Sequence, residues 1–218
     1  METRLLRRTW TICRSDLLMP TAMGRLFVFV ALLLLVQTAL AQPLSGIRTR
    51  WNDSFVEWDI LAFAPDEAPA QEGEAPPEVV VGELRLRWLN LQDDFTEWTF
   101  ELDGLRGTVR MPWKDNPAEW ELRTYQNEVI TMRASWSGDP TEWRVTNNDI
   151  ALQLKSRWKN QLDEWLVDDP TYGRFYLYTL FEADPRDWAI QDELSTDITP
   201  AMKTALVFLA VFHSSPKW

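Results

Sequence analysis

The sequence is poor in residues on which many small proteins depend: it has one cysteine, one histidine and eight glycines in 218 residues. One cysteine cannot build an internal disulfide framework, and one cysteine with one histidine cannot complete a four-ligand zinc site. Basic residues are also few, because 22 Lys and Arg stand against 33 Asp and Glu, for a formal net charge of −11. Since nucleic acid binding depends on an excess of Lys and Arg, we expect no nucleic acid partner.

Sequence motifs for catalysis are absent as well. The chain has no Gly-rich phosphate loop, no G-x-S-x-G elbow and no H-E-x-x-H sequence. The only histidine, His213, has no acid or nucleophile at the spacing of a catalytic motif. The sequence therefore predicts no catalytic residue, no metal ligand and no cofactor, and it favours a protein that is not an enzyme.

Residues 1–41 have the order of an export signal. Five arginines precede an apolar run over residues 26–36, and this run leads to Ala39-Leu40-Ala41, the small-x-small pattern of a cleavage site. The run is shorter than the roughly 20 residues of a membrane span, and no second apolar run of that length follows. We therefore expect cleavage after Ala41, export to the periplasm or the extracellular space, and no membrane span afterwards. An uncleaved N-terminal anchor is the alternative.

Cleavage leaves residues 42–218, which we expect to form a single domain stabilised by packing alone. The only cysteine, Cys13, leaves with the signal peptide. The five arginines of the signal outnumber Glu2 and Asp16 by three, so the formal net charge falls from −11 to −14. A charge of this size favours solubility and repels anionic membrane surfaces and polyanions.

Tryptophan is abundant, and eleven of the thirteen Trp residues belong to one repeated pattern. In each of six copies an opening aromatic residue is followed by a turn-forming residue, an acid and a closing Trp, and in five copies the two aromatics are seven positions apart. The closing residues recur every 22 or 23 positions from the second copy onward and are Trp58, Trp98, Trp120, Trp143, Trp165 and Trp188. A fixed period is typical of a repeated supersecondary unit.

The turn residues predict that each copy is a β-hairpin. Three copies place an Asx-Pro pair before the closing Trp, at Asn116-Pro117, Asp139-Pro140 and Asp184-Pro185. Such a pair favours a type I turn in which the Asx side chain caps the backbone. Residues that tolerate positive φ predict the return turns between copies, at Asp103-Gly104, Gln126-Asn127 and Asn147-Asn148. Six copies therefore give about twelve antiparallel strands in a meander.

Alternation with a period of two assigns the two faces of each strand. Ile130, Met132, Ala134 and Trp136 fall on one face, and polar residues fall between them. This pattern predicts that the Trp-bearing face is buried, including the opening residue Trp136. It also predicts that the opening and closing aromatics of one copy lie opposite each other across the hairpin.

Two segments depart from the hairpin pattern. Residues 64–78, rich in Pro, Glu and Ala, interrupt the first copy and predict a disordered loop. Thr199-Pro200 is typical of a helix start, and residues 202–212 are apolar nearly all round, which predicts a buried helix over residues 199–213. A terminal strand is the alternative for this tail.

The expected fold class is all-β with one C-terminal helix. We expect an antiparallel meander of about six Trp-flanked hairpins that forms a strongly coiled sheet or a barrel around the helix. Twelve strands enclose more space than their own side chains fill, and the apolar tail is the only segment that can fill it. An open single-layer sheet with the helix on its concave face is the alternative.

Two sets of repeated side chains are candidates for a site. The closing Trp residues form either a buried row or, on an open concave face, a stacking platform for an apolar or saccharide ligand. The acids before them are Glu57, Glu97, Glu119, Glu142, Glu164 and Asp187. Equivalent residues on successive hairpins are two strands, about 9–10 Å, apart, which is too far to share a calcium ion. We therefore expect each acid to be structural, closing its own turn or facing a basic neighbour such as Lys114 or Lys159.

The sequence thus favours an exported, non-enzymatic Trp-rich protein with a structural or protein-binding role in the cell envelope, whose partner is another envelope protein or a small ligand. The first alternative is a carrier of an apolar or saccharide ligand on the Trp-lined concave face. The second is a glycoside-type hydrolase that uses the tip carboxylates, whose separation lies at the edge of the inverting range. The interior of the sheet distinguishes the structural or protein-binding role from the carrier role, because a helix that fills the interior leaves no room for a ligand.

Overall fold

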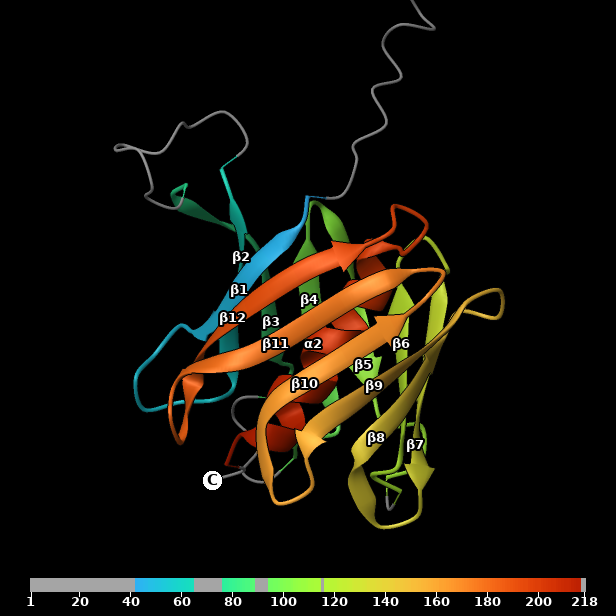
Figure 1. The fold of residues 1–218 in the computed structure, drawn as a ribbon. Coiled ribbons are helices and arrows are strands. Elements are labelled where there is room, and N and C mark those ends of the chain that lie inside the picture. The colour runs from blue at the N-terminus through green and yellow to red at the C-terminus, as the bar shows by residue number, and fades with distance from the viewer. Residues whose placement is uncertain (1–41, 65–75, 89–93, 115, 217–218) are drawn as a thin grey trace, which may run out of the picture. The chain divides into compact units, whose positions relative to one another are not determined.

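The computed structural model describes residues 42–64, 76–88, 94–114 and 116–216 (Figure 1). The predicted signal peptide, residues 1–41, lies outside the described residues, and so does most of the loop predicted over residues 64–78. The predicted end of that loop is wrong, because Glu78 begins a strand and pairs with Phe63. The N–H of Ala64 also donates to the carbonyl of Pro77 at 2.9 Å, which extends the hairpin by one further step.

Twelve strands form a closed barrel in chain order, each antiparallel to the next, with the last strand pairing with the first. The strands are β1 (Leu44–Thr49), β2 (Glu57–Phe63), β3 (Glu78–Leu86), β4 (Glu97–Leu102), β5 (Leu105–Arg110), β6 (Glu119–Thr124), β7 (Val129–Trp136), β8 (Asp139–Thr146), β9 (Ala151–Trp158), β10 (Gln161–Asp169), β11 (Gly173–Phe181) and β12 (Asp184–Leu194). One helix, α2 (Pro200–Ser214), follows them. The predicted fold class is confirmed in its closed form, and the open sheet is not observed.

The return turns occupy one end of the barrel, which we call the return end. Asp103, Gly104, Asn127 and Asn148 have φ values of 49°, 78°, 69° and 81°. These residues belong to the three predicted return turns, and positive φ explains why Asp, Asn and Gly stand there. The Trp-flanked hairpin tips lie at the opposite end, the tip end, where the last turn of α2 also lies (Figure 1).

At the hairpin tips the predicted alternation is wrong for the opening aromatic. Trp136 pairs with Asp139 across the two-residue turn Ser137-Gly138, whereas Trp143 pairs with Ala134. Between these two pairs β7 contributes one residue and β8 three, so the register shifts. A register shift of this kind bends and twists the strand locally. Trp136 therefore leaves the inward face and is 64% exposed, while Trp143 is 1% exposed.

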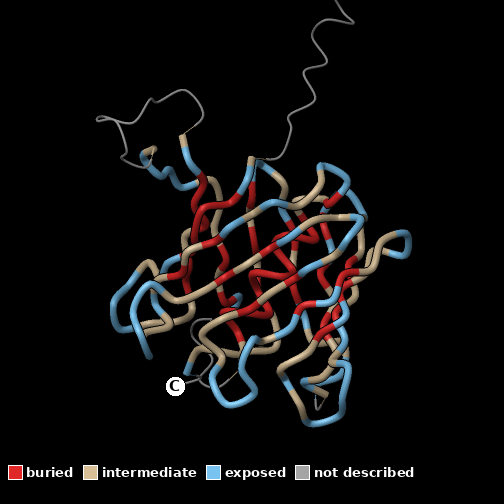
Figure 2. The backbone as a smooth tube through the Cα atoms, viewed as in Figure 1, coloured by how far each residue is buried: buried red, intermediate tan, exposed pale blue. Residues whose placement is uncertain are grey.

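The helix α2 fills the barrel. Thr199 caps it by accepting a hydrogen bond from the N–H of Met202 at 3.2 Å, and Pro200 occupies the first turn, as predicted. Every residue from Ala201 to Phe212 is buried. Figure 2 shows the buried positions gathered on the barrel wall and on the enclosed segment. The tail is therefore a core helix and not a thirteenth strand.

Candidate functional site

The six closing Trp residues share one buried geometry. Each indole N–H donates to the backbone carbonyl three residues earlier, at 2.8–3.2 Å. The turn before the Trp presents that carbonyl: Asp139, for example, accepts the N–H of Thr141 at 2.9 Å and so orients the carbonyl of Pro140. The predicted Asx capping is confirmed there. An indole that is buried needs a partner for its N–H, and the turn provides one in every copy.

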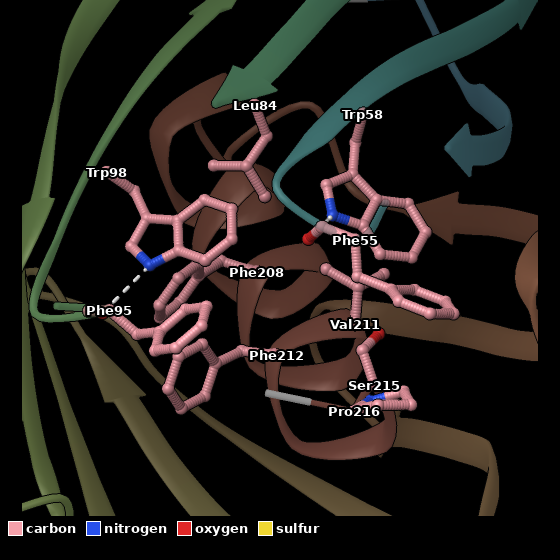
Figure 3. A pocket seen from close by; sticks show the side chains of 10 residues that line it. All are labelled: Phe55, Trp58, Leu84, Phe95, Trp98, Phe208, Val211, Phe212, Ser215 and Pro216. Atoms are coloured by element: carbon pink, nitrogen blue, oxygen red, sulfur yellow. Dashed lines mark hydrogen bonds between the residues drawn. The ribbon is translucent and has the colours of Figure 1, made fainter. Parts of the chain in front are cut away.

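These buried rings pack on α2 and leave no platform for a ligand. Phe208 lies 5.9 Å from Trp98 and 4.9 Å from Trp120, measured between ring centroids, in edge-on geometry. Figure 3 shows the packing around Trp58 and Trp98, where the remaining cavity is about 10 Å³. Such a space holds about one water molecule at most. All six rings that the sequence nominated for ligand stacking are at most 3% exposed, so no row of stacking faces is open to a ligand inside the barrel.

The acids before the closing Trp lie on the outer surface, and five of the six form an ion pair with a neighbouring strand or with the tip of their own hairpin. The pairs are Glu57–Arg85 (2.6 Å), Glu97–Arg87, Glu119–Arg133 (2.9 Å), Glu142–Lys155 (3.4 Å) and Glu164–Arg157 (2.9 Å). The predicted basic partners are wrong, because Lys114 lies 3.8 Å from Asp94 and no ion pair of Lys159 occurs among the described residues. Four of the five partners stand on strands, since outward side chains of adjacent strands lie opposite each other, and Arg87 lies in the turn directly after β3.

Asp187 is the exception among the six acids. No ion pair of this residue is found within the described ranges, although the field of Arg48 acts on it. Burial raises the pKa of Asp187 above its ordinary value, the charges of Glu78 and Asp184 raise it further, and Arg48 opposes them. Arg48 lies opposite Asp187 in the β1–β12 register without forming an ion pair, which departs from the pattern of the other copies.

We predict that the paired acids are structural and individually dispensable. Replacing Glu142 by Gln is expected to lower the free energy of unfolding by about 1 kcal/mol or less, because its partner Lys155 is solvent-exposed. Urea denaturation of the variant and the parent chain measures this difference. A larger loss, or a loss of hydrolytic activity in a folded variant, would contradict the structural role.

The sequence pattern placed the opening aromatics inside the barrel, but they lie on its surface. They form the most conspicuous exposed set in the described chain. They are 41–67% exposed and comprise Trp51, Trp88, Trp113, Trp136, Trp158 and Phe181. We call this set the aromatic rim. The two-residue turn at Ser137-Gly138 was the signal that could have found it, because such a turn pairs Trp136 with Asp139 instead of Trp143.

Polar neighbours hold several rim side chains in place. The indole N–H groups of Trp51, Trp88, Trp136 and Trp158 donate to the acids of their own copies, at 2.5–3.4 Å. The guanidinium of Arg87 lies 4.9 Å from the ring of Trp88, and that of Arg157 lies 5.3 Å from the ring of Trp158. These distances are within cation–π range. The rim is therefore a set of oriented aromatic faces rather than a set of loose side chains.

A recess opens beside the rim, between the tips of the β5–β6 and β7–β8 hairpins. It has a volume of about 280 Å³, and Pro117, Pro140, Trp143 and His213 are among its lining residues. The imidazole of His213 lies 4.7 Å from the Trp143 ring, so the C-terminal end of α2 contributes to the recess. The lining is mostly apolar, and its size suits one large side chain.

No known protein family, no curated protein and no solved structure matches this chain. No cluster of three or more His, Cys, Asp and Glu that could hold a metal ion occurs in the described part of the chain. Among the same residues, no helix is long and apolar enough to cross a membrane. The candidate site therefore rests on geometry alone, and the aromatic rim with its recess is the surface that stands out.

Proposed function

We propose that this chain is an exported, non-enzymatic protein of the cell envelope that binds another envelope protein through the aromatic rim. The observation that carries the proposal is the exposure of all six opening aromatics, between 41% and 67%, at one end of a filled barrel. Trp, Phe and Arg are the residue types enriched at the centres of protein interfaces. The rim combines them, since Arg87 and Arg157 lie against its rings.

Several rim side chains are already held in place, which lowers the entropic cost of binding a partner. Ordering a flexible side chain at an interface costs about 0.5–1.5 kcal/mol, and a side chain that is already held avoids part of that cost. The hydrogen bonds from Trp51 and Trp158 to Glu57 and Glu164 hold these rings before any partner arrives. The adjacent recess, lined in part by Pro117 and Trp143, offers a place for one anchoring side chain of the partner.

The filled interior supports this proposal over a carrier. A carrier on the Trp-lined concave face needs open space beside the closing Trp residues, and α2 packs against them instead. The ion pairs of the tip acids support it over a hydrolase. Glycoside hydrolysis uses two carboxyl groups that face one substrate, whereas Glu119 and Glu142 each face a basic residue.

A photo-crosslinking experiment in cells tests the proposal. A photoreactive amino acid replaces Trp113 or Trp136 in the rim, and in a matched control it replaces Tyr125, which is 70% exposed at the return end. Illumination is expected to give one protein adduct of defined mass at the rim positions and none at Tyr125. Adding W158S is expected to reduce the adduct at least tenfold without lowering the melting temperature, because hot-spot residues contribute about 2 kcal/mol or more. Equal adducts at Tyr125, or adducts that contain only polysaccharide or lipid, would contradict a protein partner.

A further inference from the structure

The barrel closes at a seam where β1 and β12 pair over a short distance. Their pairing covers Gly46–Arg48 with Asp187–Ala189, whereas the pairing of β12 with β11 continues to Leu194. Beyond Ala189 the wall opens into a groove of about 630 Å³, which we call the seam groove. Within the described residues, β12 makes no ladder pair with β1 from Ile190 onward, although the N–H of Leu44 still donates to the Asp192 carboxylate at 3.0 Å.

At the seam the outer surface of the barrel carries small side chains. Gly46 pairs with Ala189, and a Cβ added to Gly46 would lie 2.8 Å from the carbonyl oxygen of Trp188. The Oε1 atom of Glu78 lies about 3.7 Å from the same position, so the missing side chain leaves room for this carboxylate above β1. Tyr178 and Leu180 are among the lining residues contributed by β11, and Phe63 lines the groove from β2.

The seam groove is acidic. Glu78, Asp187, Asp192 and Glu193 belong to its lining, and no Lys or Arg does. Asp192 is neutralised by the buried Lys203, at 2.6 Å, but no ion pair of Asp187 or Glu78 is found in the described part of the chain, although Arg48 lies opposite Asp187 in the strand register. Elsewhere on the barrel, each acid equivalent to Asp187 has a basic partner of its own.

A second, independent observation points to a polar ligand in the groove. Ser45 lines the same groove, is 4% exposed, and its Oγ has no hydrogen-bond partner among the described residues. A buried hydroxyl group without a partner costs free energy, and such groups often mark an absent water, ion or ligand. A donor group bound in the groove would satisfy it.

We propose that the seam groove binds a lysine or arginine side chain of an extended basic polypeptide. The charge of the ligand would complement Glu78 and Asp187, and its N–H groups would reach the Ser45 hydroxyl oxygen. The ring of Tyr178 adds an aromatic face that favours a cation. The backbone of β12 beyond Ala189 makes no ladder pair with β1, and this favours a polypeptide, because an extended chain can form backbone hydrogen bonds with such a segment.

This inference goes beyond the proposed function, because it concerns the barrel wall at the seam and not the aromatic rim. Burial of Asp187 disfavours its ionised form, Arg48 on the paired strand offsets this only in part, and a bound cation would remove more of the cost. Relief of the unfavourable burial of the Asp187 charge is therefore expected to contribute to the free energy of binding. Salt should weaken the interaction, since the groove is open to solvent.

Fluorescence anisotropy with the purified full chain tests the proposal. The probe is a short fluorescein-labelled peptide in which lysine alternates with threonine, and its matched control has glutamate in place of lysine. We expect the lysine peptide to bind, the glutamate peptide not to bind, and spermidine to compete only weakly. D187N and E78Q are each expected to weaken binding about tenfold, since a charged hydrogen bond contributes about 1.5 kcal/mol or more. S45A should weaken it several-fold.

The control variant is E101Q, which removes an outer-face carboxylate of β4 that is paired with Arg106. It is expected to leave peptide affinity unchanged. The rim variant W136S is also expected to leave it unchanged, so a failure of the seam-groove proposal can be told apart from a failure of the proposed function. Melting curves establish that each variant is folded. Binding of the glutamate peptide, equal affinity for spermidine, or equal weakening by E101Q and D187N would overturn the proposal.

Discussion

Deleting residues 199–218 is expected to leave a chain that no longer unfolds cooperatively and is molten or aggregated. The deletion removes Leu206, Phe208, Leu209 and Phe212, all of which are buried. Burial of each such side chain contributes about 1.5–3 kcal/mol, while the whole free energy of unfolding of a domain is about 5–15 kcal/mol. The barrel cannot replace this packing, since the closing Trp rings would then surround an empty interior.

Circular dichroism in the near and far ultraviolet, with a thermal scan, measures this outcome. A graded comparison comes from F208A, which removes one ring that contacts both Trp98 and Trp120. This variant is expected to remain folded but to lose about 3–5 kcal/mol of stability. A truncated chain that melts cooperatively at the parent temperature would show that α2 is peripheral to the fold.

Replacing Asp192 by Asn is expected to lower the free energy of unfolding by about 3–5 kcal/mol, the cost of leaving one buried charge without its partner. The side chains of Asp192 and Lys203 are 0% and 6% exposed, and they lie 2.6 Å apart. The same carboxylate accepts the N–H of Leu44 at 3.0 Å, so it joins α2, β12 and the start of β1. An Asn at this position retains an oxygen that can accept the N–H of Leu44. Most of the expected loss therefore comes from leaving the charge of Lys203 without its partner.

Urea denaturation of D192N, K203M and the double variant D192L/K203M measures the coupling between these side chains. The double variant is expected to recover most of the lost stability, because apolar residues of similar volume replace a buried ion pair at little or no cost. The exposed pair Arg106–Glu101 provides the comparison, and E101Q is expected to change the melting temperature little. A D192N chain as stable as E101Q would refute a structural role for the buried pair.

Features that depend on residues a few positions apart were predictable from the sequence. The positive φ values at Asp103, Gly104 and Asn148 follow from residue types that tolerate them. The start of α2 follows from Thr199-Pro200. Burial of the closing Trp residues follows from the period-two alternation of the strands, and the number of strands follows from counting turns. These signals are local, so no knowledge of the folded barrel was needed.

The register at the hairpin tips could not be predicted from local sequence patterns. Two turn signals stand next to each other in the fourth copy, Ser137-Gly138 and Asp139-Pro140. The chain reverses at the first signal, and the second forms the irregular segment that gives the Trp143 indole its carbonyl partner. Alternation alone placed Trp136 inside, because it assumed an unbroken register through the tip. The aromatic rim exists because the register shifts there.

The sequence by itself thus determined the hairpins, the core face and the helix, each from residues within one copy or one turn. The folded barrel was needed to bring β1 against β12, to place Lys203 on Asp192, and to leave Asp187 without the ion pair that its equivalents have. The physical reason is that these contacts join distant parts of the chain. Their geometry depends on the summed register and curl of all twelve strands and on what fills the interior, and no single segment of the sequence carries that sum.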